Sequence, residues 1–310
     1  MNHYTAIIPA AGKGVRLLPY TEHCPKTMLS VAGKPIIAHI LAQLEECGIK
    51  RVVFIVGYQK ESLIEFVHSH YPHLDVVFIE QQEQKGLGHA VYLAKQAVQG
   101  PCLIVLGDTI IDGDLAPLVQ GNINGVGVKM VEDPHRFGVV ELDDHKIVGF
   151  EEKPEHPKSN LALIGAYSFL DSAVLFESLE EVIASGKTVK NEIQLTDALE
   201  NLLEKGLSIQ PIVMNDWFDC GTLDSMLYAN HALLDRMHSE KVQISSSTRI
   251  IEPCWIDPSA VVEDCVLGPY VSVGEKAVVR RCQLQDTIIS PNTKLQDKHG
   301  THFIFDPYNN

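Results

Sequence analysis

The chain is poor in basic residues. Among 310 residues, 25 lysines and arginines stand against 40 aspartates and glutamates, which gives a formal net charge of −15. So acidic a surface repels polyanions, which argues against general binding to nucleic acid or to anionic membranes. Local groups of positive charge are therefore informative, and we expect any anionic partner to be a small molecule.

Metal-binding and disulfide motifs are absent. The seven cysteines are scattered without a CxxC pair, and the fourteen histidines form no HExxH motif. This pattern argues against a structural zinc site, and it predicts reduced cysteines that serve in packing.

Long apolar runs are absent as well. Residues 1–5 are polar, and the apolar segment after them is too short for the core of a secretory signal. No run approaches the length of a membrane span. We therefore expect a cytoplasmic protein without a membrane partner.

The most informative stretch is residues 6–35, AIIPAAGKGVRLLPYTEHCPKTMLSVAGKP. After an apolar strand, Gly12 and Gly14 let the backbone turn tightly and offer N–H groups to an anion. Arg16 adds a bidentate donor, and Lys26 adds a mobile point charge. The stretch therefore predicts a phosphate site.

A Rossmann dinucleotide-binding turn is the alternative interpretation of this loop. Its fingerprint requires a third glycine three residues after Gly14 and an acidic residue at the end of the next strand. This chain has Leu17 at that position and continues as a basic loop interrupted by prolines. The pattern therefore disfavours the Rossmann turn.

Helix and strand patterns then alternate. Helices are expected at 36–48, 63–70 and 89–98, and strands at 51–56, 76–79 and 102–106. This alternation predicts an α/β fold with a Rossmann-like, mostly parallel sheet and helices on both faces, which binds ligands at the carboxyl ends of its strands. Hairpin-like strands at 125–131, 138–142, 146–151 and 163–169 predict an antiparallel lid. Further helices are expected at 173–184, 195–204 and 223–237, with a strand at 208–214.

The C-terminal segment has another period. Ile256, Val262, Leu267, Val273 and Val279 follow one another at spacings of six, five, six and six residues. Such repeats are typical of a short left-handed parallel β-helix, with a generic β-rich tail as the alternative. Two to three coils would fit. Because so short a helix exposes its coil ends, we expect an oligomer contact or a regulatory cap there, and a homo-oligomer.

The first loop, taken whole, resembles the signature of the sugar nucleotidyltransferases, the nucleoside-diphosphate-sugar pyrophosphorylases. That signature has GxGxRL, then a proline and a threonine, then PK and GKP. The matching positions are Gly12, Gly14, Arg16, Leu17, Pro19, Thr21, Pro25, Lys26, Gly33, Lys34 and Pro35. Val15 departs from the usual threonine, and Thr27 and Met28 depart from the usual proline and leucine.

The resemblance implies the nucleotide-diphospho-sugar transferase fold. With the polar, serine-rich stretch 238–247 as a linker, we expect a nucleotidyltransferase domain over 1–240, the short β-helix over 241–298, and an aperiodic tail over 299–310.

The resemblance also implies a nucleotide-binding half of the site. Gln81 would read the base edge, and Gly86 would let the backbone approach the base. An amide donates and accepts at once, which suits thymine or uracil; a surface loop is the alternative. The implied nucleotide-binding residues are Ala11, Gly12, Gly14, Arg16, Lys26, Gln81 and Gly86.

Two carboxylates are candidate Mg²⁺ ligands. Asp108 follows a buried strand, where a hard oxygen ligand can hold Mg²⁺ against triphosphate oxygens. Asp219, in NDWFDCGT, resembles the family's WxDxGT motif, with a helix cap as the alternative. Asp112 and Asp114 fit turn formation better than metal binding.

The segment 131–167 resembles the family's sugar-phosphate half. That resemblance implies that Gly138 and Glu152 hold sugar hydroxyls and that Lys153 clamps the sugar phosphate. A cation there would also offset the repulsion between a dianionic nucleophile and a triphosphate. Asn160, Gly165 and Tyr167 would line the pocket, and Glu192 would either complete it or cap a helix.

The implied activity joins a sugar 1-phosphate to a nucleoside triphosphate and releases pyrophosphate, with Arg16, Lys26 and Lys153 as catalytic residues and Mg²⁺ as cofactor. The string SNLALIGAY and the C-terminal repeats are most similar to the longer glucose-1-phosphate thymidylyltransferases. A UTP-dependent uridylyltransferase and a catalytically silent, ligand-sensing subunit are the alternatives. Retention of the full set of charged residues argues against the silent subunit.

Overall fold

The computed structural model describes residues 4–237 and 245–309. The chain divides into two compact units. The first unit comprises Met1–Gly12 and Ile40–Trp217, and the second comprises Lys13–His39 and Phe218–Asn310. The phosphate loop, taken from here on as residues 13–35, therefore belongs to the second unit, together with the C-terminal strands.

The first unit is built on a nine-stranded sheet with the order β10-β9-β11-β6-β1-β4-β5, from which β8 and β12 branch at β11. Its parallel part consists of β1 (Thr5–Pro9), β4 (Arg51–Val56), β5 (Asp75–Glu80) and β6 (Cys102–Val105). Its antiparallel part consists of β8 (Gly125–Met130), β9 (Gly138–Asp143), β10 (Lys146–Glu152) and β11 (Leu161–Phe169). Strand β12 (Gln210–Val213) runs parallel to β8, and β7 (Thr109–Asp112) follows β6.

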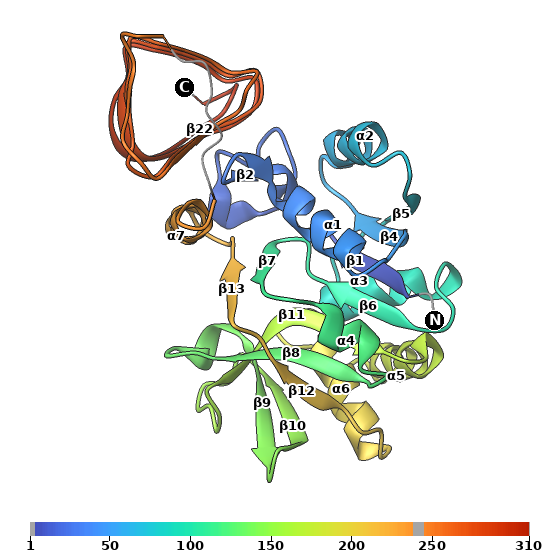
Figure 1. Cartoon of the computed structure of the whole chain (residues 1–310). Coiled ribbons are helices and arrows are strands. Elements are labelled where there is room, and N and C mark those ends of the chain that lie inside the picture. The colour runs from blue at the N-terminus through green and yellow to red at the C-terminus, as the bar shows by residue number, and fades with distance from the viewer. Residues whose placement is uncertain (1–3, 238–244, 310) are drawn as a thin grey trace. The chain divides into compact units, whose positions relative to one another are not determined.

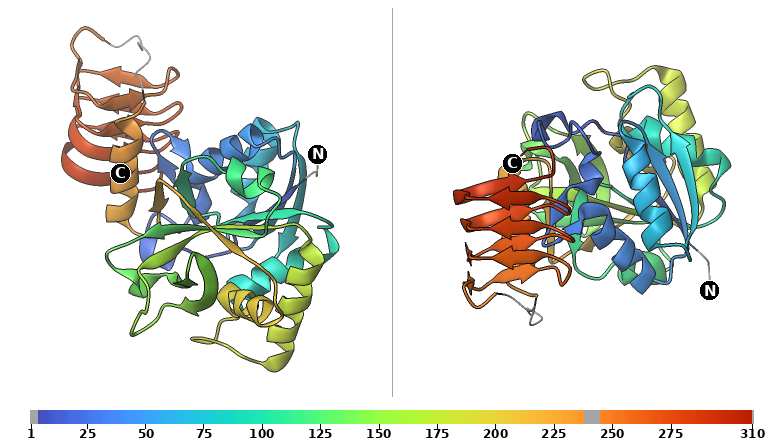
Figure 2. Two further views of the ribbon diagram at one scale, coloured as in Figure 1. Left: turned by 60° about the horizontal axis from the view of Figure 1, so that its bottom comes forward. Right: turned by 90° about the horizontal axis from the view of Figure 1, so that it is seen from above.

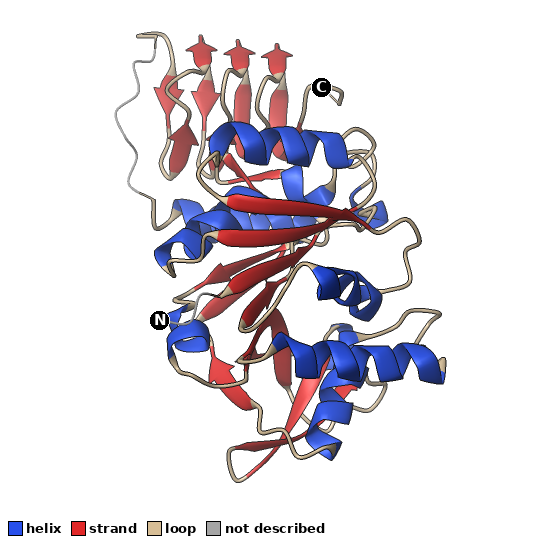
Figure 3. Cartoon of the chain, turned by 90° about the vertical axis from the view of Figure 1, so that its right-hand side faces the viewer, coloured by secondary structure: helices blue, strands red, loops and turns tan. Residues whose placement is uncertain are grey.

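Helices cover both faces of this sheet, as predicted (Figures 1 and 3). They are α1 (Ile36–Glu46), α2 (Lys60–His70), α3 (Leu87–Leu93), α4 (Ala116–Gln120), α5 (Ser172–Ser185) and α6 (Leu195–Glu204). Val91, Leu175 and Leu199 bring α3, α5 and α6 into one apolar cluster with Ile7 and Ile104 of the central strands. Burial of each such side chain stabilises the fold by about 1.5–3 kcal/mol.

The strand order reverses at β1. The chain proceeds from β1 to β4 and β5 on one side and then crosses to β6 on the other. The Ala10 N–H donates to the Ile55 carbonyl at 2.7 Å, and the Gly107 N–H donates to the Pro9 carbonyl at 3.1 Å. The loops after β1, β4 and β6 therefore start side by side, at the kind of crevice where open α/β sheets bind ligands.

The predicted elements of this unit are confirmed, with shifts at their ends. The antiparallel strands expected to form a lid belong instead to the same sheet as the parallel strands, because β11 pairs with β6. Strand β4 and helix α6 have the predicted bounds, whereas the helix expected over 89–98 ends as α3 at Leu93 and continues as a 3₁₀ turn over Ala94–Gln96. All seven cysteines are free thiols, as predicted. Among the described residues, no helix is both long and apolar enough to cross a bilayer.

The second unit begins with the phosphate loop. The loop contains two 3₁₀ turns, Val15–Leu17 and Lys26–Met28, and a small hairpin of β2 (Ser30–Val31) and β3 (Lys34–Pro35). After β13 (Asp216–Asp219), which spans the boundary between the units, the chain forms α7 (Leu223–Leu234). A reciprocal capping box between Thr222 and Ser225 fixes the start of α7.

The rest of the second unit is a stack of short parallel strands over residues 249–305, here named the C-terminal stack (Figure 2). Its strands are β14 (Arg249–Ile250), β15 (Cys254–Ile256), β16 (Val261–Glu263), β17 (Val266–Leu267), β18 (Val271–Val273), β19 (Val278–Arg280), β20 (Gln283–Ile289), β21 (Lys294–Gln296) and β22 (His299–Phe305). Residues that pair between neighbouring strands, such as Val262 and Val279, are 17 residues apart in the sequence. This spacing is the length of one coil of the stack. Leu267, Val273 and Leu284 point into the buried interior.

The C-terminal end differs from the prediction. Residues 299–305, expected to belong to an aperiodic tail, form β22, which pairs in parallel with β20 and adds a further layer to the stack. Gly300 and His302 obscure the apolar repeat in the sequence, but main-chain pairing does not require it. The predicted helix over 223–237 ends at Leu234. Most of the predicted linker, residues 238–244, lies outside the described residues.

Candidate active site

The loop after β1 starts at the crevice of the first unit. The Ala11 carbonyl accepts a hydrogen bond of 2.8 Å from the Gln84 amide, which ties it to the loop after β5. A Cβ on Gly57, just after β4, would lie 2.8 Å from the same carbonyl oxygen. Gly12 is exposed, and a Cβ there would meet nothing within 4 Å. Its backbone therefore borders open space, as a loop that receives a phosphate requires.

In the phosphate loop of the second unit, the conformation of Gly14 and its close neighbours require a glycine. This residue has φ +62°, and a Cβ on it would lie 2.9 Å from Thr21 Cγ2 and 3.2 Å from Lys26 Cβ. The Thr21 hydroxyl donates to the Gly14 carbonyl at 2.9 Å and closes the loop on itself. Lys26 is thereby held in a buried position, whereas Arg16 is exposed.

Two predicted site residues of the second unit meet at Gly221. Arg16 Nη2 lies 2.9 Å from the position that a Cβ on Gly221 would occupy, and Asp219 Oδ1 lies 3.0 Å from it. The structure thus brings together the predicted triphosphate-binding arginine and a predicted metal-binding carboxylate. Gly221, the glycine of the DCGT motif, has no side chain and so leaves room for both groups. The motif alone did not reveal this role.

The predicted base-reading residue, Gln81, is buried at 6% exposure. Its amide nitrogen donates to the Gly86 carbonyl at 3.2 Å and lies 3.0 Å from Nδ1 of His89. Burial lowers the pKa of His89, with Lys85 contributing, which favours the neutral ring that can accept at Nδ1. The loop therefore holds the Gln81 side chain in one orientation.

Gly86 lies very close to the backbone of a distant segment, at Glu192 and Ile193. It has φ +98°, and a Cβ there would lie 2.6 Å from the Ile193 carbonyl oxygen and 2.8 Å from Glu192 Cβ. The Ile193 N–H donates to the Lys85 carbonyl at 2.8 Å. The structure thus places the loop that carries Gln81 beside Glu192, which the sequence connected with the sugar pocket or with a helix cap.

The carboxylates after β6 have different surroundings. Asp108 is half-buried in the loop after β6, at the crevice. Asp114 accepts a hydrogen bond of 2.7 Å from the Ala116 N–H, so it forms a turn. Within the described residues, no group of three or more histidine, cysteine, aspartate or glutamate residues gathers to hold a metal ion. Mg²⁺ commonly uses only one or two carboxylates together with substrate phosphates, so carboxylates such as Asp108 and Asp219 fit this ion better than zinc.

Glu152 is the centre of a polar group at the end of β10. Lys153 Nζ lies 3.2 Å from Glu152 Oε1 and exposes 44% of its side chain. Gly138 is the residue opposite Glu152 on β9, and a Cβ on it would lie 3.1 Å from Glu152 Oε2. Three of the predicted sugar-phosphate residues are therefore adjacent.

Thr196 is a fourth member of this group, and sequence reasoning missed it. Its hydroxyl donates to Glu152 Oε2 at 3.2 Å, and its Cγ2 lies 3.0 Å from the Cβ position of Gly138. The motif NEIQLTD drew attention to Glu192 alone, because a threonine in the first turn of a helix is common for local reasons.

The other predicted sugar-site residues have backbone or core roles in the structure. Tyr167 is buried in the core, and burial raises the pKa of its hydroxyl, with the Glu152 charge contributing. Gly165, at φ +86°, packs closely on Leu106 and accepts the Leu106 N–H at 2.9 Å. Asn160 is exposed, and its carbonyl accepts from the Val131 N–H at 3.0 Å.

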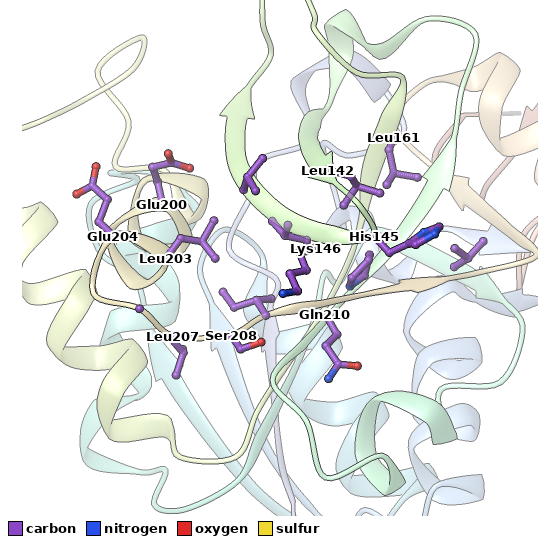
Figure 4. Close-up of a pocket in the computed structure, with 16 residues that line it drawn as sticks. Leu142, His145, Lys146, Leu161, Glu200, Leu203, Glu204, Leu207, Ser208 and Gln210 are labelled. Atoms are coloured by element: carbon purple, nitrogen blue, oxygen red, sulfur yellow. The ribbon is translucent and has the colours of Figure 1, made fainter.

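A cavity of about 850 Å³ lies in the first unit, between the β9–β10 hairpin, α6 and β12 (Figure 4). None of the predicted site residues lines it. Its wall is largely apolar, and Glu200, Glu204 and Lys146 are among the residues that line it. A triphosphate would meet two carboxylates there, so this cavity does not suit the nucleotide.

Comparison with protein families gives a match to the model described as "Nucleotidyl transferase" over residues 5–236. The bifunctional protein GlmU of Methanocaldococcus jannaschii is 39% identical over 76% of this chain, and the chain spans only 55% of that protein's length. The glucose-1-phosphate thymidylyltransferase of Streptomyces antibioticus is 31% identical over 92% of this chain and 86% of its own.

Solved structures show the same likeness. A UDP-glucose pyrophosphorylase complexed with UDP-glucose superposes with a TM-score of 0.67, at 27% identity, over 76% of this chain and the whole of that chain. The sequence relatives thus include a glucose-1-phosphate thymidylyltransferase, and the solved structures include a UDP-glucose pyrophosphorylase.

Proposed function

Because the chain belongs to the nucleotidyl transferase family, we propose that it transfers a thymidylyl group from dTTP to glucose 1-phosphate and releases pyrophosphate. The observation that carries this choice is the extent of the match to the thymidylyltransferase, which covers 92% of the chain and so includes part of the C-terminal stack. The match to GlmU covers 76% of the chain.

In this reaction a phosphate oxygen of the sugar phosphate attacks the α-phosphorus of dTTP in line, and pyrophosphate leaves. Lys153 binds the sugar phosphate, and its charge offsets the repulsion between the two anions. Glu152 and Gly138 receive sugar hydroxyls, with Asn160, Gly165 and Tyr167 around them.

Arg16 and Lys26 bind the triphosphate and stabilise the charge that grows on the leaving pyrophosphate. Ala11, Gly12 and Gly14 supply backbone contacts to the phosphates. Gln81 and Gly86 receive the base. Both Nε2 hydrogens of Gln81 are used within the protein, by the Gly86 carbonyl and by Nδ1 of His89, so its Oε1 is the atom that accepts the imide N–H of thymine.

Asp108 and Asp219 are the residues that would hold Mg²⁺. The ion would neutralise phosphate charge, which is the usual contribution of Mg²⁺ to phosphoryl transfer. Asp219 lies beside the Arg16 guanidinium, so it also orients that cation.

The stacked coils of the second unit fit a left-handed parallel β-helix, and we propose that they support a homo-oligomer. The first layer of the stack, with β14 and β15, leaves main-chain groups without a strand beyond it in the described chain. An exposed strand edge of this kind readily pairs with another chain. A cytoplasmic location would suit the seven free thiols.

A second candidate is UTP-dependent uridylyl transfer to glucose 1-phosphate. It is favoured by the likeness to a pyrophosphorylase complexed with UDP-glucose. Thymine and uracil share the imide edge that Gln81 would meet, so this residue does not distinguish the two nucleotides.

The test is pyrophosphate release with Mg²⁺, using dTTP, UTP, GTP, CTP and ATP with glucose 1-phosphate and then with other sugar 1-phosphates. We expect the highest kcat/KM with dTTP and glucose 1-phosphate. A preference for UTP would establish the second candidate. Binding of a nucleotide without turnover of any pair would instead indicate the silent, ligand-sensing subunit.

A further inference from the structure

The phosphate loop is packed against the C-terminal stack, and the first contact is between Gly33 and Trp255. Gly33, of the GKP motif, has φ +81° and is buried. A Cβ on Gly33 would lie 2.0 Å from both Cε3 and Cζ3 of Trp255, a distance at which atoms overlap. The indole of β15 therefore rests directly on the backbone of the loop.

Asn230 of α7 makes the second contact. It has no exposed surface. Its Oδ1 accepts a hydrogen bond of 2.9 Å from the Ala32 N–H, and its Nδ2 donates to the Tyr270 carbonyl at 3.3 Å. Because an amide can accept and donate at once, this side chain joins the loop to the stack in a way that neither a carboxylate nor an apolar residue can reproduce.

The third contact lies nearer to Lys26. The rings of His23 and Tyr308 are 4.2 Å apart between centroids. Burial raises the pKa of the neighbouring Cys24 thiol to about 11, and the Asp306 charge adds to the shift. The residues after β22 thus reach the loop between Thr21 and Lys26.

These contacts matter because the loop has little regular structure of its own. Between Lys13 and Pro35 it contains two 3₁₀ turns and one short hairpin. Fixing the backbone of each residue costs about 1–2 kcal/mol of conformational entropy, so a defined loop needs a rigid support. The described residues of the C-terminal stack and α7 provide it.

We propose that Trp255 and Asn230 are positioning residues for nucleotide transfer: they hold the phosphate loop in the shape that presents Arg16 and Lys26 to the triphosphate. The role rests on the proposed function of the loop. It gives the C-terminal stack a direct part in nucleotide binding, in addition to any part in assembly.

The test compares Trp255→Ala with the wild-type chain. We expect the KM for the preferred triphosphate to rise about tenfold, since small misplacements of binding groups have effects of this size or larger. The KM for the sugar 1-phosphate should stay unchanged, because Glu152 and Lys153 lie in the first unit. Trp255→Phe should restore most of the affinity. Phe303→Ala, which removes an exposed ring of the same stack, is the matched control and should behave as wild type.

A suppressor experiment addresses the contact itself. Gly33→Ala should weaken triphosphate binding because its methyl group overlaps the indole, and Trp255→Ala in the same chain should recover part of the loss. If the stack of Trp255→Ala fails to fold, as circular dichroism and the melting transition would show, Trp255→Leu serves instead.

The outcomes separate the two proposals. Calorimetry with Mg²⁺ and each of dTTP, UTP, GTP, CTP and ATP establishes whether the wild-type chain binds a triphosphate. Binding by wild type and equal binding by Trp255→Ala would overturn the positioning role alone. An equal rise in the KM values for both substrates would overturn it too. Failure of the wild type to bind any of these nucleotides would overturn the proposed function and the positioning role with it.

Discussion

Arg16 and Asp219 converge on Gly221: Arg16 Nη2 lies 2.9 Å, and Asp219 Oδ1 3.0 Å, from the position that a Cβ on Gly221 would occupy. Because Gly221 has no side chain, there is room for both groups: the cation that we propose binds triphosphate and the carboxylate that we propose holds Mg²⁺. The arrangement orients the guanidinium before substrate arrives, which reduces the reorganisation needed in the transition state.

Gly221→Ala should therefore lower kcat/KM for the triphosphate by about ten- to a hundredfold, because the methyl group displaces Arg16 or Asp219 from its position. Steady-state kinetics with each substrate varied in turn would measure the effect. Gly149→Ala is the matched control, since a Cβ there would make only ordinary contacts at 3.7 Å with Glu141. An unchanged kcat/KM for Gly221→Ala would show that the pair has no role in turnover.

Thr196→Val should raise the KM for the sugar 1-phosphate several-fold and leave the KM for the triphosphate unchanged. Valine keeps the shape of threonine but removes the hydrogen bond to Glu152, and a hydrogen bond to a charged group contributes about 1.5–3 kcal/mol. Thr196→Ser retains the donor and should behave nearly as wild type. Equal effects of the valine and serine variants would contradict the role of the hydroxyl.

Asp108→Asn should lose most of the Mg²⁺-dependent turnover, because an amide oxygen lacks the full negative charge with which a carboxylate holds this ion. A titration of activity against Mg²⁺ concentration would show the loss as a higher requirement and a lower plateau. Asp114→Asn is the control, since Asp114 accepts a hydrogen bond from Ala116 in a turn. A Mg²⁺ titration of Asp108→Asn that overlays the wild-type curve would exclude Asp108 as a ligand.

Lowering the pH should stabilise the folded second unit through protonation of His302. Its ring contacts Asp224 at 2.8 Å and Asp286 at 2.9 Å, and these carboxylates raise the pKa of His302; Asp286 also contacts His231. A pKa raised in the folded state contributes stability that is fully present below the unfolded value of about 6.5 and is lost as the pH rises through the folded value.

The melting temperature of His302→Gln should therefore fall below that of the wild type by more at about pH 6 than at about pH 8.5, on either side of the ordinary histidine pKa. Differential scanning calorimetry across this range would measure the gap. His156→Gln, an exposed histidine of the first unit, is the control. A gap that widened toward high pH would have the opposite sign and contradict the ion pairs.

Local patterns determined much of the first unit. The β-branched run of β4 and the periodic apolar face of α6 are local signals, and both elements have the predicted bounds. The glycines and cations of the first loop are also contiguous in sequence, so its chemistry and the family could be inferred without a structure. Ends such as that of α3 shifted because tertiary contacts, and not helix propensity, decide where a turn stops.

The sequence by itself thus determined the elements, the family resemblance and the candidate residues of each substrate half. Only the tertiary structure decided which of them meet: Thr196 with Glu152, Arg16 with Asp219, and Trp255 with Gly33. It also placed residues 299–305 in the stack. The physical reason is that secondary structure and turns follow from neighbours along the chain, whereas these contacts depend on side-chain shape and hydrogen bonding between segments that are brought together only by folding.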